Sequence, residues 1–199
     1  MEKKNNELTK TFWIITLILC LLCIVGIGVG YYFYKQETEK EVFKEELGGD
    51  VYLKFVGNTN GLTLLNASPM TDQLGALQDG ENKYFDFSVE VKLDQADFVE
   101  YEIAIEKDKA FSNIPDNEVK FYLEEENSGS FSKIFGPSEF KPLEKESDLG
   151  TEAGDMVLYS VKKNSSGTTN YRLRMWMADA STMPVGNYSV EVLINGKAN

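Results

Sequence analysis

The sequence predicts an all-β domain, an antiparallel β-sandwich of about eight strands of jelly-roll or immunoglobulin-like type, carried on an N-terminal transmembrane helix. Three observations predict it. Apolar and polar residues alternate along several short runs after residue 50, clusters of turn-forming residues separate these runs, and residues 11–34 form one uncharged, mostly apolar segment.

The apolar segment has the length and the flanks of a membrane-spanning helix. A helix of this length rises about 34 Å, which is enough to cross the hydrocarbon core of a bilayer. Trp13 lies near one end, and Tyr31, Tyr32 and Tyr34 lie at the other, as in interfacial aromatic belts. We expect residues 1–10 to be a basic cytoplasmic stub, residues 11–34 a signal anchor, and the rest of the chain to lie outside the cell.

A cleaved signal peptide is the alternative for this segment. Lys3, Lys4 and Lys10 form a basic start, and Gly28-Val-Gly30 has small residues at the spacing of a cleavage site. The unbroken apolar run as far as Tyr34 favours retention, and cleavage near Gly30 stays open. If the helix is retained, Gly26 and Gly30 would let a second helix approach closely, because small residues four apart share one helix face.

Residues 35–49 are expected to be a helical stalk between the membrane and the domain. Residues 35–47 contain strong helix formers and no helix breaker, and Gly48-Gly49 would end the helix. Such a stalk would reach about 20 Å beyond the bilayer. The β-sandwich domain is then expected to cover residues 50–199.

Period-two alternation defines the strands and their buried faces, because successive side chains of a strand point to opposite sides of the sheet. The stretch from 128 to 154 is the least regular and is expected to be a long loop with one short strand. Strands are expected at 51–56, 62–65, 83–93, 99–105, 119–123, 131–135, 156–158, 171–177 and 188–194. The residues expected to face the core include Phe85, Phe87, Val89, Val91, Val99, Tyr101, Ile103, Ile105, Tyr171, Leu173, Met175, Met177, Tyr188, Val190, Val192 and Ile194.

Composition excludes several classes of function. The net charge of -12 disfavours nucleic acid, which needs a basic surface. The chain has no histidine, and its two cysteines, Cys20 and Cys23, lie inside the apolar segment. We therefore expect no enzyme active site, no metal site and no cofactor. Three acidic groups offer the oxygen ligands that calcium prefers, but none has the spacing of an EF-hand loop. They are Glu124 to Glu126, Asp94 with Asp97, and Asp148 with Glu152 and Asp155.

One strand suggests an interaction surface. Arg172, Arg174 and Trp176 share the face of 171–177 that is opposite to the core residues. Arginine and tryptophan often dominate protein interfaces, so this face is the candidate contact site. Two alternatives stay open, namely that the tryptophan is buried at a sheet edge and that the arginines pair with the domain's own carboxylates.

Four strands carry a resemblance to a known family: Tyr84-Phe-Asp-Phe-Ser-Val-Glu-Val91, Tyr101-Glu-Ile-Ala-Ile105, Tyr171-Arg-Leu-Arg-Met-Trp176 and Tyr188-Ser-Val-Glu-Val192. Their order behind an apolar N-terminal segment resembles bacterial surface proteins of the TasA/camelysin type. It is also similar to N-terminally anchored surface proteins of Gram-positive bacteria. The resemblance implies a jelly-roll sandwich and a role in a biofilm matrix or fibre.

These observations predict a membrane-anchored, extracellular structural or adhesive module that acts by binding. The alternative is a subunit of a larger membrane complex or surface fibre. The expected partners are the membrane itself and another surface protein, a second copy of the chain or an anionic cell-wall polymer.

Overall fold

The computed structural model describes residues 41–46, 52–56, 61–80, 83–93 and 96–198. Contacts divide the chain into two compact units, residues 1–40 and residues 41–199, and the description below concerns the second unit alone. The transmembrane segment at 11–34, with Gly26 and Gly30, lies outside the described residues. None of the helices that are described is long and apolar enough to span a bilayer.

The described part of the second unit contains ten strands and two short helical segments. The elements in chain order are β1 (Glu41–Glu46), β2 (Tyr52–Val56), β3 (Gly61–Ala67), α2 (Asp72–Ala76), β4 (Tyr84–Lys92), β5 (Val99–Lys107), η1 (Asp116–Glu118), β6 (Val119–Asn127), β7 (Ser130–Glu139), β8 (Met156–Lys163), β9 (Gly167–Met177) and β10 (Gly186–Ala198).

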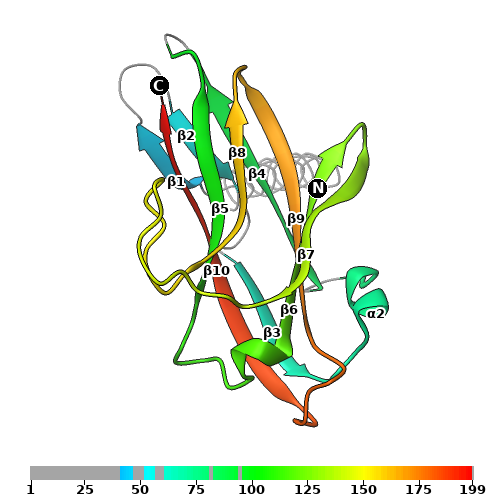
Figure 1. Cartoon of the computed structure of the whole chain (residues 1–199). Coiled ribbons are helices and arrows are strands. Elements are labelled where there is room, and N and C mark those ends of the chain that lie inside the picture. The colour runs from blue at the N-terminus through cyan, green and yellow to red at the C-terminus, as the bar shows by residue number, and fades with distance from the viewer. Residues whose placement is uncertain (1–40, 47–51, 57–60, 81–82, 94–95, 199) are drawn as a thin grey trace, which may run out of the picture. The chain divides into compact units, whose positions relative to one another are not determined.

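The strands form two antiparallel sheets (Figure 1). Among the described strands, one sheet has six in the order β1-β2-β4-β9-β6-β7, and the other has four in the order β3-β10-β5-β8. Hydrogen bonds and ring contacts join the inner faces of the two sheets: Tyr101 on β5 meets Tyr171 on β9, and Phe121 on β6 meets Tyr188 on β10. The antiparallel β-sandwich expected from the alternation is therefore confirmed.

The predicted core faces of β4, β5, β9 and β10 are also confirmed. Phe87 is 3% exposed, and its ring stacks on the ring of Tyr171 with a centroid distance of 5.4 Å. Tyr171 lies opposite Phe87 in the β4–β9 register. The residues expected to face the core are buried, except Leu93, which was expected on the same face as Phe85 but follows the end of β4 and is only partly buried.

The helical stalk expected over residues 35–49 is wrong for residues 41–46. These residues form strand β1, which pairs with β2 at the edge of the six-stranded sheet. Helix propensity is a weak preference, and pairing with a sheet edge that is already formed outweighs it. The β-structure therefore begins at Glu41 rather than at residue 50, while residues 35–40 lie outside the described part of the chain.

The stretch from 128 to 154 begins with a ten-residue strand rather than a short one. Ser128 and Gly129 both have positive φ, at 54° and 80°, as a two-residue type I′ hairpin turn requires. This turn directs β7 back along β6, and the register runs from Asn127 opposite Ser130 to Lys120 opposite Glu139.

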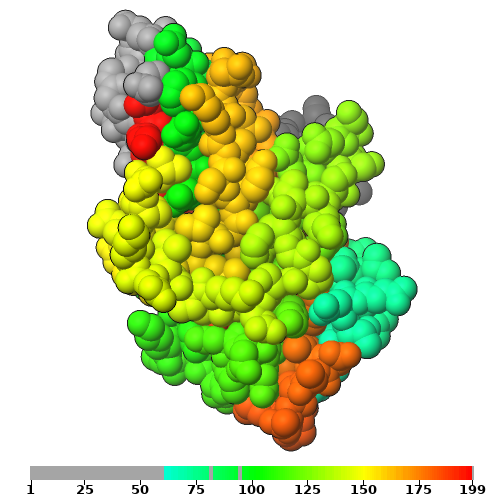
Figure 2. All heavy atoms as spheres, viewed as in Figure 1, coloured from blue at the N-terminus to red at the C-terminus, as the bar shows by residue number. Residues whose placement is uncertain are grey.

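The remainder of this stretch, residues 140–155, is a surface loop fastened to β5, and it is the yellow segment in Figures 1 and 2. The Glu102 carboxylate on β5 accepts hydrogen bonds from the hydroxyls of Ser147, at 2.7 Å, and Thr151, at 2.8 Å. Asn195 on β10 donates to the same threonine hydroxyl at 3.0 Å. Because Glu102 and Thr151 are buried, these bonds hold the loop firmly against the four-stranded sheet.

Candidate functional site

Strand β9 brings Arg172, Arg174 and Trp176 to the outer face of the six-stranded sheet, as the alternation predicts. Arg172 makes a two-pronged ion pair with Asp86 on β4, at 2.7 Å and 2.8 Å. Its guanidinium carbon lies 3.9 Å from the ring centre of Tyr84 and 4.2 Å from that of Phe131. The hydrogen bond to Asp86 raises the pKa of Arg172. This arginine is therefore fully engaged by the domain itself.

Arg174 is buried and paired as well. It is 7% exposed, and its Nε donates to a carboxylate oxygen of Glu124 on β6 at 2.8 Å. Its Nη1 donates to the backbone carbonyl of Gln78, which follows α2. Ion pairs within the domain were one of the alternatives open for the two arginines, and the structure has both.

Trp176 is fully buried, as one of the two alternatives for this residue has it, although β9 lies in the interior of the sheet and not at its edge. Helix α2 covers it: the indole nitrogen donates to Asp72 at 3.2 Å, and Gly75 packs directly on the ring. The space-filling view shows the segment that carries α2 standing at the surface of the domain (Figure 2). Arg174 and Trp176 are therefore buried, while Arg172 stays partly exposed and paired with Asp86.

The sequence contains an N-cap residue for α2, but its apolar residues do not show the spacing of a helix. Thr71 is the N-cap residue, and its hydroxyl accepts a hydrogen bond from the backbone nitrogen of Leu74 at 3.4 Å. A threonine before Asp72-Gln73-Leu74 is a standard start for a helix. The helix buries Gly75 and exposes Leu74 and Leu77, the reverse of the usual pattern, so apolar periodicity could not reveal it.

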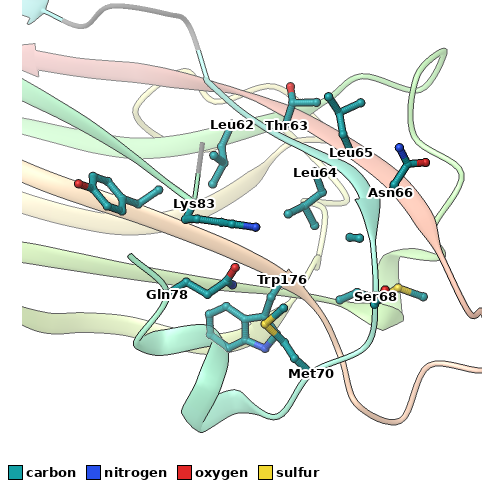
Figure 3. Close-up of a pocket in the computed structure, with 13 residues that line it drawn as sticks. Leu62, Thr63, Leu64, Leu65, Asn66, Ser68, Met70, Gln78, Lys83 and Trp176 are labelled. Carbon is teal, nitrogen blue, oxygen red and sulfur yellow. The ribbon is translucent and has the colours of Figure 1, made fainter. Parts of the chain in front are cut away.

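A groove of about 660 Å³ lies between β3 and the neighbouring ends of β4 and β9 (Figure 3). Two further hollows in the described part of the chain have volumes of about 410 Å³ and 220 Å³. One wall comes from β3, and the floor comes from Gln78, Lys83 and the Trp176–Met177 end of β9. A volume of this size suits a small ligand or a short segment of a larger one.

Apolar and polar groups share the lining of this groove. Leu62, Leu64 and Met70 contribute apolar surface, while Asn66 and Ser68 contribute hydrogen-bonding side chains. In Figure 3 the side chains of Leu64 and Lys83 point into the groove from opposite sides, and the indole of Trp176 lies below them.

The lining of the groove carries positive charge and no negative charge. Lys83 is the one charged residue among the described lining residues, and it makes no ion pair with any residue that the structure describes. The Nε2 atom of Gln78 is buried and has no hydrogen-bond partner. The polar side chains of the described lining include one ammonium, amides and hydroxyls, all of which can form hydrogen bonds with a bound ligand.

The acidic groups with calcium-type oxygen ligands lie only partly within the residues that the structure describes. Within the described ranges, no group of three or more Asp, Glu, Cys or His side chains is placed to hold a metal ion. Glu124 is paired with Arg174, and Asp94 lies outside the described residues. Burial and the nearby carboxylates of Glu106 and Glu152 raise the pKa of Asp155.

Comparison with known proteins gives no family. No family model matches the chain, and no curated protein matches it. Among solved structures, the chain is similar to AvmM, which is described as catalysing macrocyclization in alchivemycin A biosynthesis. The two share 9% identity, the match covers 79% of this chain and 96% of that chain, and the TM-score is 0.29.

Two carbohydrate-binding modules show similarity of the same weak kind. TmCBM27, described in terms of mannan recognition, has 10% identity, covers 83% of this chain and 92% of its own, and has a TM-score of 0.21. A structure with CBM51-2 from Clostridium perfringens ZmpB has 8% identity, 80% and 40% coverage, and a TM-score of 0.19. At these TM-scores the likenesses support no assignment.

Proposed function

We propose that this chain is a membrane-anchored extracellular binding module and that it engages its partner through the groove beside β3. The observation that carries this proposal is the groove itself, which combines an apolar wall with the Lys83 ammonium and the Gln78 Nε2 atom, neither of which has a partner among the described residues. Mostly apolar hollows with a few hydrogen-bonding groups are the usual form of ligand sites.

The sandwich is a suitable frame for such a site. The groove residues come from β3, from the segment between α2 and β4, and from the end of β9, and each of these is tied to a sheet or to the core. A rigid scaffold that presents side chains at its rim loses little conformational freedom when a partner binds.

The proposed location rests on the apolar segment at 11–34 and the basic residues before it. Protease added to intact cells tests it. We expect residues after the segment to be digested from outside, and an epitope tag placed before Met1 to stay protected. Protection of the whole chain would contradict an extracellular domain.

The test of binding uses full-length protein, purified in detergent and incubated with envelope fragments from the producing cells. The variant Ser68→Trp places a bulky ring in the groove at an exposed position. We expect it to weaken binding at least about tenfold. The matched control is Ser165→Trp in the exposed loop between β8 and β9, which should bind like the wild type. Equal binding by both variants would refute the groove as the binding site.

The role in a biofilm matrix or fibre remains a proposal that rests on the resemblance to TasA/camelysin-type proteins. Its test is matrix formation by cells that produce only the Ser68→Trp chain. Normal matrix, together with normal levels of the protein, would contradict a matrix role for the groove.

A further inference from the structure

We infer that the groove beside β3 binds an extended peptide that carries a carboxylate, with the carboxylate held by Lys83. This inference deepens the proposed function and rests on it. It follows from the charge of the lining, from an unpaired donor on the groove floor and from the composition of the wall.

The charge of the lining selects an anion. The chain has a net charge of -12, yet the described residues that line this groove include Lys83 and no carboxylate. In contrast, Lys107, Lys120 and Lys162 each lie within 4 Å of a carboxylate elsewhere in the domain. An ammonium that points into a groove without a counter-charge attracts negatively charged groups from solution (Figure 3).

The groove floor contains a hydrogen-bond donor that has no acceptor among the described residues, and a ligand could supply one. The buried Nε2 of Gln78 has no partner, while the backbone carbonyl of the same residue is held by Arg174. Buried donors in folded proteins are almost always paired. A carboxylate or peptide oxygen that reaches the floor beside Lys83 would satisfy this donor, and the fixed backbone of Gln78 would make the contact specific.

The wall of the groove favours a peptide over a sugar. Leu62, Leu64 and Met70 provide aliphatic surface, which suits apolar side chains. The Trp176 ring is fully buried beneath α2. The ring of Tyr84, the other aromatic residue of the described lining, is already packed against the guanidinium of Arg172 at 3.9 Å. In addition, β3 lies beside β10 at the edge of the four-stranded sheet, and edge strands are the places where extended peptides add to a sheet.

The experiment presents full-length protein with three pools of N-acetylated octapeptides of random sequence without aspartate or glutamate. One pool has a free C-terminal carboxylate, the second has a C-terminal amide, and the third has the amide and a single central glutamate. Bound peptides are counted by mass spectrometry. We expect the carboxylate pools to be retained about tenfold more than the neutral pool. Preference for the first or the third pool then separates a terminal carboxylate from a side-chain carboxylate.

Variants assign the effect to the groove. Lys83→Met should abolish the preference for carboxylates, and Lys83→Arg should keep it. Lys133→Met on β7, an exposed lysine that does not line the groove, is the matched control and should bind like the wild type. Equal retention of all three pools would overturn the inference. Retention of oligogalacturonate but of no peptide pool would overturn the assignment to a peptide.

The two proposals can fail separately. If Ser68→Trp abolishes binding to envelope fragments while Lys83→Met does not change it, the groove is the binding site and the carboxylate inference is wrong. If Ser68→Trp has no effect on envelope binding, the proposed function itself is wrong.

Discussion

Replacing Gly75 with alanine tests whether α2 is held on the sheet by close contact with Trp176. A Cβ atom added at Gly75 would lie 2.2 Å from Cδ2 and 2.4 Å from Cε2 of the indole ring. Favourable carbon contacts lie at about 3.5–4.0 Å, so either the helix or the ring must move by more than about 1 Å.

Two effects of opposite sign decide the result. Inside a helix, alanine is more favourable than glycine by about 1 kcal/mol. An overpacked contact costs about 1–3 kcal/mol, and lifting α2 instead exposes part of an indole that buries about 150–250 Å². Because the clash falls on a fully buried ring, we expect packing to prevail and the free energy of unfolding to drop by about 1–2 kcal/mol.

The assay uses a Trp13→Phe background, in which Trp176 is the one tryptophan of the chain. In Gly75→Ala the emission maximum should shift to the red and quenching by acrylamide should increase, and urea denaturation gives the loss of stability. Gly167→Ala is the control, because a Cβ there meets nothing within 4 Å. Unchanged emission together with equal or greater stability in Gly75→Ala would refute the close packing of α2 on Trp176.

Four further variants test the core and the ion pairs. Phe87→Ala should cost about 3–5 kcal/mol in denaturant unfolding, because the ring is buried against Tyr171, and a loss below about 1 kcal/mol would contradict its place in the core. Glu124→Gln should cost about 3 kcal/mol, because it leaves a buried guanidinium without its counter-charge. Asp86→Asn should cost less than about 1 kcal/mol, because the Asp86 side chain is 46% exposed, and equal losses for the two variants in thermal or urea unfolding would refute this difference. Burial raises the pKa of Tyr101 to about 12, while an unfolded tyrosine ionises near pH 10. The stabilising effect of the neutral phenol is therefore complete below pH 10 and is lost between about pH 10 and pH 12 as the unfolded state releases its proton first. Tyr101→Phe should make the fall of stability in this range shallower by about 1.4 kcal/mol per pH unit, and an unchanged slope would contradict it.

The buried faces could be predicted because they depend on a local rule. In Phe85 to Leu93 and in Tyr188 to Ile194, every second residue is apolar, and a strand with one buried face needs no other information. Strand β1 could not be predicted in the same way, since Glu41–Glu46 contains good helix formers and becomes a strand by pairing with β2.

The groove could not be predicted because no local pattern describes it. Leu64, Gln78, Lys83 and Trp176 are separated along the sequence and meet only after β3, α2 and β9 have been placed. The alternation assigned Trp176 to the correct face of β9, but the exposure of that face depends on α2, which crosses it from another part of the chain. Side-chain direction is a local property, whereas burial by a distant segment is not.

The positions of β9 and β10 determine when this domain is able to fold. β10, at residues 186–198, lies between β3 and β5, and β9 lies between β4 and β6, so the strands synthesised last occupy the interior of both sheets. Before they emerge from the ribosome, β3 has no partner in its sheet and β4 lacks its pairing with β9. Such distant pairings form slowly. If the chain is exported as proposed above, a channel that accepts unfolded polypeptides would therefore receive it before either sheet has closed, and the sandwich would assemble after translocation.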